Sequence, residues 1–227
     1  MILGAHYDHV GDDPPALVCE TGEDGESVCV EEPGLRYPGA NDNASGIGVL
    51  LEIARVWHEA GYQPARTVVF AAWNGQESGQ LGSTFYVEHP VFPIEDTVAV
   101  IQLDAVGGGE GYYLEVTGLI DQDGYLLYIM QAADDIVDGR LHLNYETEGA
   151  GSTRVRPEAF FSVTGRQGLT ELSDHLPFRD AGIPALMVRW RGADERNLPE
   201  QMADEVNPDW LNYTGRMVSM AAMMLAR

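Results

Sequence analysis

Three polar residues, His6, Glu77 and Asp104, come at or just after the ends of segments predicted to be buried strands. A fourth, Asp42, lies in a loop that leads into a predicted helix. The carboxyl ends of parallel strands meet at one edge of an open α/β sheet, which is where such sheets bind ligands. One imidazole and three carboxylates gathered there suit Zn²⁺ in a hydrolytic site, and a carboxylate can bridge two ions about 3.5–4 Å apart. We therefore expect Asp42 to be the hub of a metal site, with Asp8 orienting the imidazole of His6.

Each of these residues taken alone has an ordinary structural explanation. A lone Asp42 would be a turn former or a helix N-cap, and a lone Glu77 would be a loop charge. Their shared position at strand ends is what favours the metal site. A serine triad is not an alternative for Ser173, Asp174 and His175, because sequence neighbours cannot form a triad among themselves.

The elements that must position these side chains follow from hydrophobic periodicity. Continuous apolar runs typical of buried parallel strands alternate with amphipathic helices, which predicts an α/β sandwich around a mostly parallel sheet in a single domain, 1–227. The strands are expected at residues 1–5, 67–73, 97–103, 112–116 and 184–190, with an edge strand at 141–145. The helices are expected at 44–60, from 121, from 173 and, capped by Asn207 before Pro208, from 208 to the end.

Composition excludes several functions. The net charge is −23 and all 13 basic residues are Arg, so nucleic-acid binding is not expected. Without Lys, a P-loop and a Schiff-base mechanism are excluded. No apolar run reaches the length of a membrane span, and no signal peptide is visible. Because the chain opens at once on a strand, we expect it to be the core of something longer, with a flanking domain, or a processed domain.

Two cysteines, Cys19 and Cys29, bracket an acidic, hairpin-like insertion within a long loop at 11–40. A disulfide between them would add about 2–3 kcal/mol and would place the protein in an oxidising compartment, extracytoplasmic or secreted. The alternative is two free thiols in a cytoplasmic protein. We favour the disulfide because nothing else explains two cysteines on one insertion.

Several motifs in one order along the chain resemble the di-zinc aminopeptidases, a family that also includes glutamate carboxypeptidases and glutaminyl cyclases. They are the segments 4–9, 38–46, 70–83, 103–104 and 173–178. The resemblance implies a three-layer α/β/α fold, with the family's N-terminal helix and first strands missing here. It also implies that His6 and Asp104 hold one zinc, that Asp42 bridges, and that Glu77 holds the second zinc.

Three positions depart from the family's pattern. The general base is replaced by Gln76, which cannot accept a proton. The family's motif with the second zinc's histidine aligns with residues 197–201, so that ligand becomes Asn197 and its supporting acid becomes Gln201. A neutral amide is a poor substitute for imidazole on zinc. We therefore expect one tightly bound zinc, with two as the alternative.

Two main hypotheses follow, and a third is less favoured. The first is a peptidase-fold protein, a pseudoenzyme candidate, whose degraded site leaves activity weak or lost. The second is an active, atypical metallo-aminopeptidase that removes N-terminal residues from peptides, with His9 or His175 filling the vacant ligand or base role. The third, acyl transfer of the glutaminyl cyclase kind, also needs an acid at Gln76. Asp174 and His175 are expected to support the site or contact a peptide or aminoacyl ligand.

Overall fold

A five-stranded sheet forms the centre of the computed structural model, which describes residues 1–14, 16–21, 27–108, 114–141, 173–190 and 202–227. The strand order across the sheet is β4 (Val69–Trp73), β1 (Ile2–His6), β5 (Val100–Leu103), β7 (Ala185–Trp190) and β6 (Leu114–Thr117). The first four strands are parallel, and β6 is antiparallel to β7. The predicted mixed, mainly parallel sheet is confirmed, and its parallel strands place their carboxyl ends along one edge.

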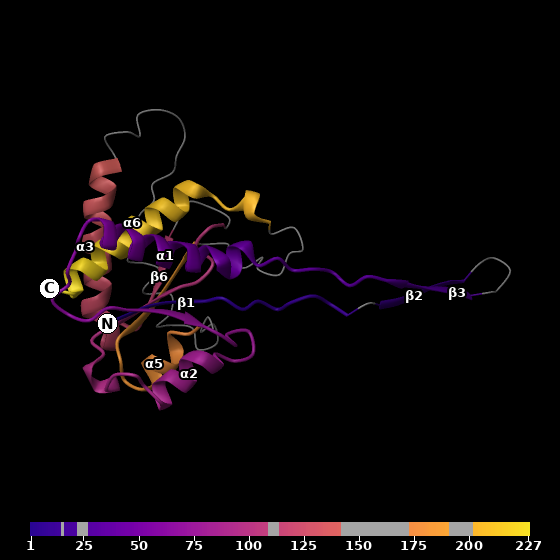
Figure 1. The fold of residues 1–227 in the computed structure, drawn as a ribbon, viewed down its shortest axis with the longest axis horizontal. Coiled ribbons are helices and arrows are strands. Elements are labelled where there is room, and N and C mark those ends of the chain that lie inside the picture. The colour runs from indigo at the N-terminus through magenta and orange to yellow at the C-terminus, as the bar shows by residue number, and fades with distance from the viewer. Residues whose placement is uncertain (15, 22–26, 109–113, 142–172, 191–201) are drawn as a thin grey trace.

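Helices cover both faces of this sheet (Figure 1). One core is shared with α1 (Ser45–Glu59), α3 (Ile120–Leu141) and α6 (Pro208–Leu225), and the other with α2 (Leu81–Glu88) and α5 (Leu176–Asp180). Alternate residues of β1 divide between the two cores: Leu3 and Ala5 lie in the first and Ile2 in the second. This alternation is the two-residue period of a strand that is buried on both faces, and it gives three layers.

Local sequence signals explain where the long helices begin and end. Before α6, the side chain of Asn207 accepts hydrogen bonds from the backbone N–H groups of Asp209 and Trp210, and Pro208 occupies the first turn. This is the predicted N-cap followed by proline. After α1, Gly61 takes a left-handed conformation with φ of 64°, as expected for a residue that ends a helix.

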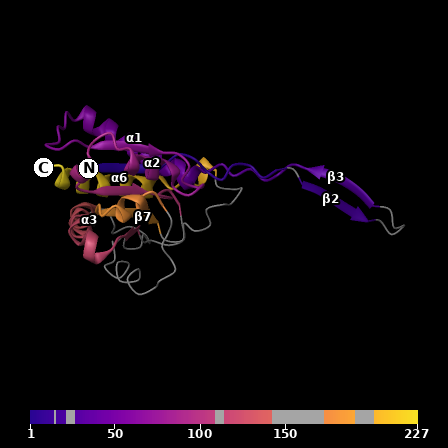
Figure 2. The same ribbon diagram turned by 90° about the horizontal axis from the view of Figure 1, so that it is seen from below.

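A two-stranded arm extends from the body between residues 9 and 40, and both views show it projecting away from the sheet (Figures 1 and 2). It consists of β2 (Ala16–Thr21) and β3 (Ser27–Glu32), which are antiparallel, with Cys19 directly opposite Cys29. Directly opposed residues in such a pair have Cα atoms about 4.5–5.5 Å apart, within the range that a disulfide spans. The register is compatible with the disulfide, which stays a prediction.

The remaining elements are short: η1 (Ala40–Ala44), η2 (Ile94–Asp96) and η4 (Ala203–Glu205). The prediction of an edge strand at 141–145 is wrong at its first residue, because Leu141 is the last residue of α3. Residues 142–145 lie outside the described residues. Ile129, Ala133 and Val137 are spaced four residues apart and pack into the core, so the buried face of α3 continues toward Leu141. Within the described ranges, no helix is long and apolar enough to cross a membrane.

Candidate metal centre

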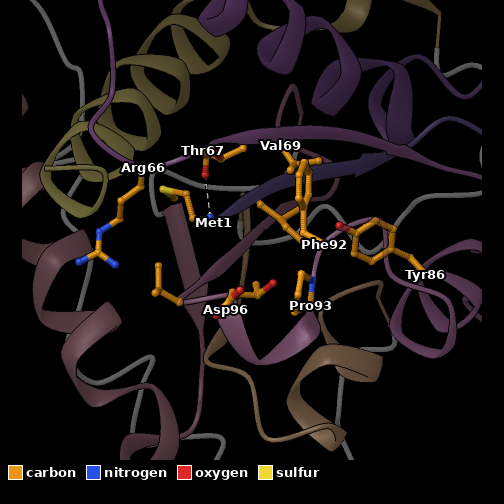
Figure 3. A pocket seen from close by; sticks show the side chains of 11 residues that line it. Met1, Arg66, Thr67, Val69, Tyr86, Phe92, Pro93 and Asp96 are labelled. Carbon is orange, nitrogen blue, oxygen red and sulfur yellow. Dashed lines mark hydrogen bonds between the residues drawn. The ribbon is translucent and has the colours of Figure 1, made fainter.

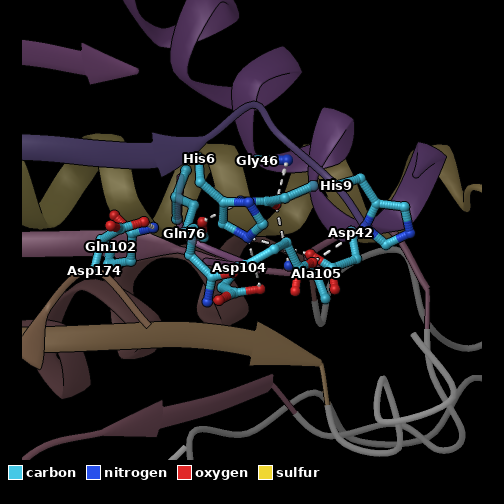
Figure 4. Close-up of polar contacts among 12 residues, drawn as sticks. His6, His9, Asp42, Gly46, Gln76, Gln102, Asp104, Ala105 and Asp174 are labelled. Atoms are coloured by element: carbon cyan, nitrogen blue, oxygen red, sulfur yellow. Dashed lines mark hydrogen bonds and ion pairs between the residues drawn. The ribbon is translucent and has the colours of Figure 1, made fainter. Parts of the chain in front are cut away.

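The first group of potential ligands is His6, Asp42 and Asp104, all buried. His6 ends β1 and Asp104 directly follows β5, and these two strands are hydrogen-bonded neighbours. The Nε2 atom of His6 lies 3.2 Å from Oδ1 of Asp42 and 3.6 Å from Oδ1 of Asp104 (Figure 4). The structure thus brings together at one sheet edge three of the four residues nominated from the sequence.

Asp8 holds two parts of the site at once. Its backbone carbonyl lies 3.1 Å from Nδ1 of His6, whereas its carboxylate is 3.8 Å from that nitrogen. The carboxylate instead accepts hydrogen bonds from the backbone N–H groups of Gln76 (3.1 Å) and Glu77 (3.2 Å). With Nδ1 donating to the carbonyl, Nε2 of His6 is directed toward the two buried acids.

The electrostatics of this group favour a cation. Burial lowers the pKa of His6, but hydrogen bonds and charges from Asp104 and Asp42 outweigh it and raise that pKa to about 11. Burial also raises the pKa of Asp42, an effect opposed by His6 and reinforced by the negative charges of Asp104 and Glu77. Without another cation, the cluster therefore retains a proton, and a divalent ion could take its place.

Two asparagines that the sequence argument did not single out clamp the loop that carries Asp42. The side chain of Asn43 donates a hydrogen bond to the carbonyl of Leu103 (2.9 Å) and accepts one from the N–H of Ala105 (3.1 Å). These two residues flank Asp104. The side chain of Asn41 accepts a hydrogen bond from the backbone N–H of Gly107, three residues after Asp104 (2.8 Å). Asn41 and Asn43 flank Asp42 in the sequence, and this adjacency is the one sequence feature that pointed to them.

A second group of potential ligands shares Asp42 with the first: His9, Asp42 and Glu77. One ligand atom from each of the three lies within 4.8 Å of the others. Nδ1 of His9 is 3.2 Å from Oε1 of Glu77. Glu77, the fourth nominated residue, therefore joins the site through Asp42 and beside a histidine that the sequence analysis named only as an alternative.

The two expected supporting residues, Asp174 and His175, are both buried. Asp174 accepts hydrogen bonds from Ser83 (2.5 Å) and Gln102 (3.3 Å), and burial raises its pKa to about 6. His175 is fully buried, which lowers its pKa to about 3 and keeps it neutral. Gln76 is 6% exposed, and its side chain lies beside the first group in Figure 4.

Two further nominated positions, Asn197 and Gln201, lie outside the described residues. A pocket of about 230 Å³ lies elsewhere, at the amino ends of the strands (Figure 3). Met1 and Val69 line it, so it opens at the sheet edge opposite the acids and is separate from the metal centre.

Comparison with known proteins shows which family the chain belongs to. The sequence pattern of peptidase family M28 matches residues 1–222. The chain belongs to this family. It is 26% identical over 190 residues to aminopeptidase YwaD of Bacillus subtilis, covering 81% of this chain and 37% of that protein. It is also 34% identical over 162 residues to a glutamate carboxypeptidase 2 homolog of Caenorhabditis elegans, covering 65% of this chain and 20% of the other.

A solved structure supports the fold. The zinc aminopeptidase BSAP from Bacillus subtilis superposes with a TM-score of 0.67 at 23% identity, covering all of this chain and 46% of that one. The chain spans less than half the length of these relatives. The resemblance drawn from the motifs is thus confirmed for the family and for the α/β fold.

Proposed function

We propose that this chain is the metal-binding domain of a zinc aminopeptidase-family protein in which peptide hydrolysis is weak or lost. One observation carries the proposal: a buried glutamine, Gln76, lies beside the metal centre at the position where the family resemblance expects the general base. Its amide has no proton-accepting function near neutral pH.

The donor set of the first group fits zinc. One imidazole nitrogen and two carboxylates leave a fourth position open, which is the ligand count of a catalytic zinc site. Nε2 of His6 and Oδ1 of Asp42 are both buried and lie 3.2 Å apart, so each has the other as its close polar neighbour in the absence of a metal. Two buried polar atoms facing each other in this way are compatible with a cation that both would bind.

Zinc bound here would supply Lewis-acid polarisation of a carbonyl and would acidify a water molecule. The protein's own part is to orient His6 through Asp8 and to hold Asp42 through its neighbouring asparagines. The missing part is a base, since Gln76 accepts no proton from the attacking water. Loss of general-base assistance typically lowers the rate by about 10²–10⁴-fold.

The second candidate function is an active, atypical aminopeptidase acting on the N-termini of peptides. It is favoured by the complete and buried trio of His6, Asp42 and Asp104. Its base would have to be another residue. His175 is poorly suited to that role because burial lowers its pKa to about 3, so it holds a proton weakly at neutral pH.

One assay separates the two candidates. The zinc-loaded chain is tested on aminoacyl anilides, together with Gln76→Glu and the double variant Gln76→Glu, Asn197→His. We expect little turnover from the natural chain and a gain of about 10²–10⁴-fold on restoring the acid. Ser78→Glu is the matched control, because it adds the same charge to an exposed position in the same loop. A turnover of about 10 s⁻¹ or more from the natural chain would contradict the proposal.

A further inference from the structure

His9 stands three residues after β1, and Glu77 stands four residues after β4. These strands are paired in parallel register, with His6 opposite Trp73, so the two loops leave the sheet side by side. The backbone N–H of Tyr7 donates to the carbonyl of Trp73 (3.0 Å), which continues the ladder beyond the strand. The strand order thus places His9 next to Glu77, although 67 residues separate them in sequence.

The loop that carries Glu77 is also held in place by Asp8. The carboxylate of Asp8 binds the backbone N–H groups of Gln76 and Glu77, and Asp8 directly precedes His9. On its other side, His9 packs against Gly39, where an added Cβ atom would come within 3.0 Å of the imidazole. The imidazole is therefore held between two loops, and its side chain is 11% exposed.

The polar atoms of His9 lack a complete set of partners. Its Nδ1 lies 3.2 Å from Oε1 of Glu77, while its Nε2 is buried and makes no hydrogen bond to any described residue. Glu77 and the buried Asp42 each offer a carboxylate oxygen within 4.8 Å of a ring nitrogen of His9. A sequestered imidazole beside two carboxylates is a donor set that suits a divalent transition-metal ion.

We propose that His9 is the nitrogen ligand of a second divalent ion, which Glu77 also binds and which Asp42 bridges to the first. This inference rests on the proposed zinc site at His6. It assigns to His9 the place of the histidine that Asn197 replaces in the family motif. The expectation of a single tightly bound ion assumed that Asp42 and Glu77 alone remained at the second position, and His9 adds a third ligand there.

The alternative is that His9 and Glu77 form only an ion pair. Such a pair needs no metal, and it leaves the number of bound ions independent of His9. The two possibilities therefore differ in metal stoichiometry, which can be measured without any catalytic activity.

The test uses the full chain, freed of metal by a chelator and titrated with Zn²⁺ by calorimetry, with elemental analysis after dialysis. We expect two ions per natural chain, and we expect His9→Ala and His9→Gln to retain the first ion and to bind the second at least about 10–100-fold more weakly. His58→Ala is the matched control, because that histidine is exposed on α1. His6→Ala should instead remove the tighter ion.

Titration of the chain with ¹⁵N-labelled histidine provides a second measurement that does not depend on a variant folding. The ring nitrogens of His9 should shift with the second equivalent of Zn²⁺. If His9→Ala and His9→Gln bind Zn²⁺ as the natural chain does, or if His9 does not shift, the inference is wrong while the His6 site stands. If the natural chain binds no Zn²⁺, both the inference and the proposed function fail.

Discussion

Measuring whether His6 is positively charged in the metal-free protein tests directly whether Asp42 and Asp104 favour a cation between them. The carboxylates of Asp104 and Asp42 overcome the effect of burial and raise the pKa of His6 from 6.5 to about 11. That difference corresponds to roughly 6 kcal/mol of stability, at about 1.4 kcal/mol per pKa unit. Because the folded pKa is raised, this stability is fully present below pH 6.5 and is lost as the pH rises through 11.

The perturbation is His6→Gln, compared with the natural chain in the presence of a chelator between pH 7 and pH 9. Over that window the natural chain should lose about 3 kcal/mol of its free energy of unfolding through His6. The variant lacks the titrating group, so the difference between the two proteins should shrink by the same amount. Urea denaturation at each pH measures it, and His58→Gln controls for the loss of an exposed histidine.

The same proton must leave before zinc binds. The apparent affinity for Zn²⁺ should therefore rise about tenfold per pH unit between pH 7 and pH 9, whereas an ordinary histidine would give little change there. If the natural chain and His6→Gln show parallel stability curves over this window, His6 is not held as a cation by the two acids. Asp42 and Asp104 would then not favour a cation at this position.

Three further predictions concern the two-stranded arm and two buried residues near the site. Thiol titration of unreduced, natively produced protein should find no free thiol at Cys19 or Cys29; two free thiols would exclude the disulfide. Burial lowers the pKa of His175 to about 3, so its stability contribution is lost as the pH falls below 6.5. The metal-free chain should lose about 2 kcal/mol between pH 7 and pH 5 that His175→Gln does not lose, and equal losses would contradict this. Asn43→Ala should destabilise the fold by about 3 kcal/mol in urea denaturation, because it leaves buried backbone groups without partners; a loss below about 1 kcal/mol would show that the clamp is dispensable.

Much of the fold could be predicted because its signals are local. Continuous apolar runs predicted the buried strands that became β1, β4, β5 and β7, and the proline after Asn207 predicted the start of α6. Alternation of strands and helices then required parallel pairing, which gathers the strand ends at one edge. His6 and Asp104 could be nominated for the same edge of the sheet from that rule alone. The same rule failed for residues 141–145, where the helix α3 continues to Leu141.

Only the tertiary structure decided which side chains meet. The sequence placed His9 and Glu77 on two loops, but their contact depends on β1 lying beside β4, and periodicity does not encode strand order. The same holds for Asn43, whose hydrogen bonds reach residues 60 and 62 positions away. Hydrophobic patterns report which face of an element is buried, because burial acts on each side chain separately. Polar contacts depend on distance and direction between two groups, and these exist only once the sheet has assembled.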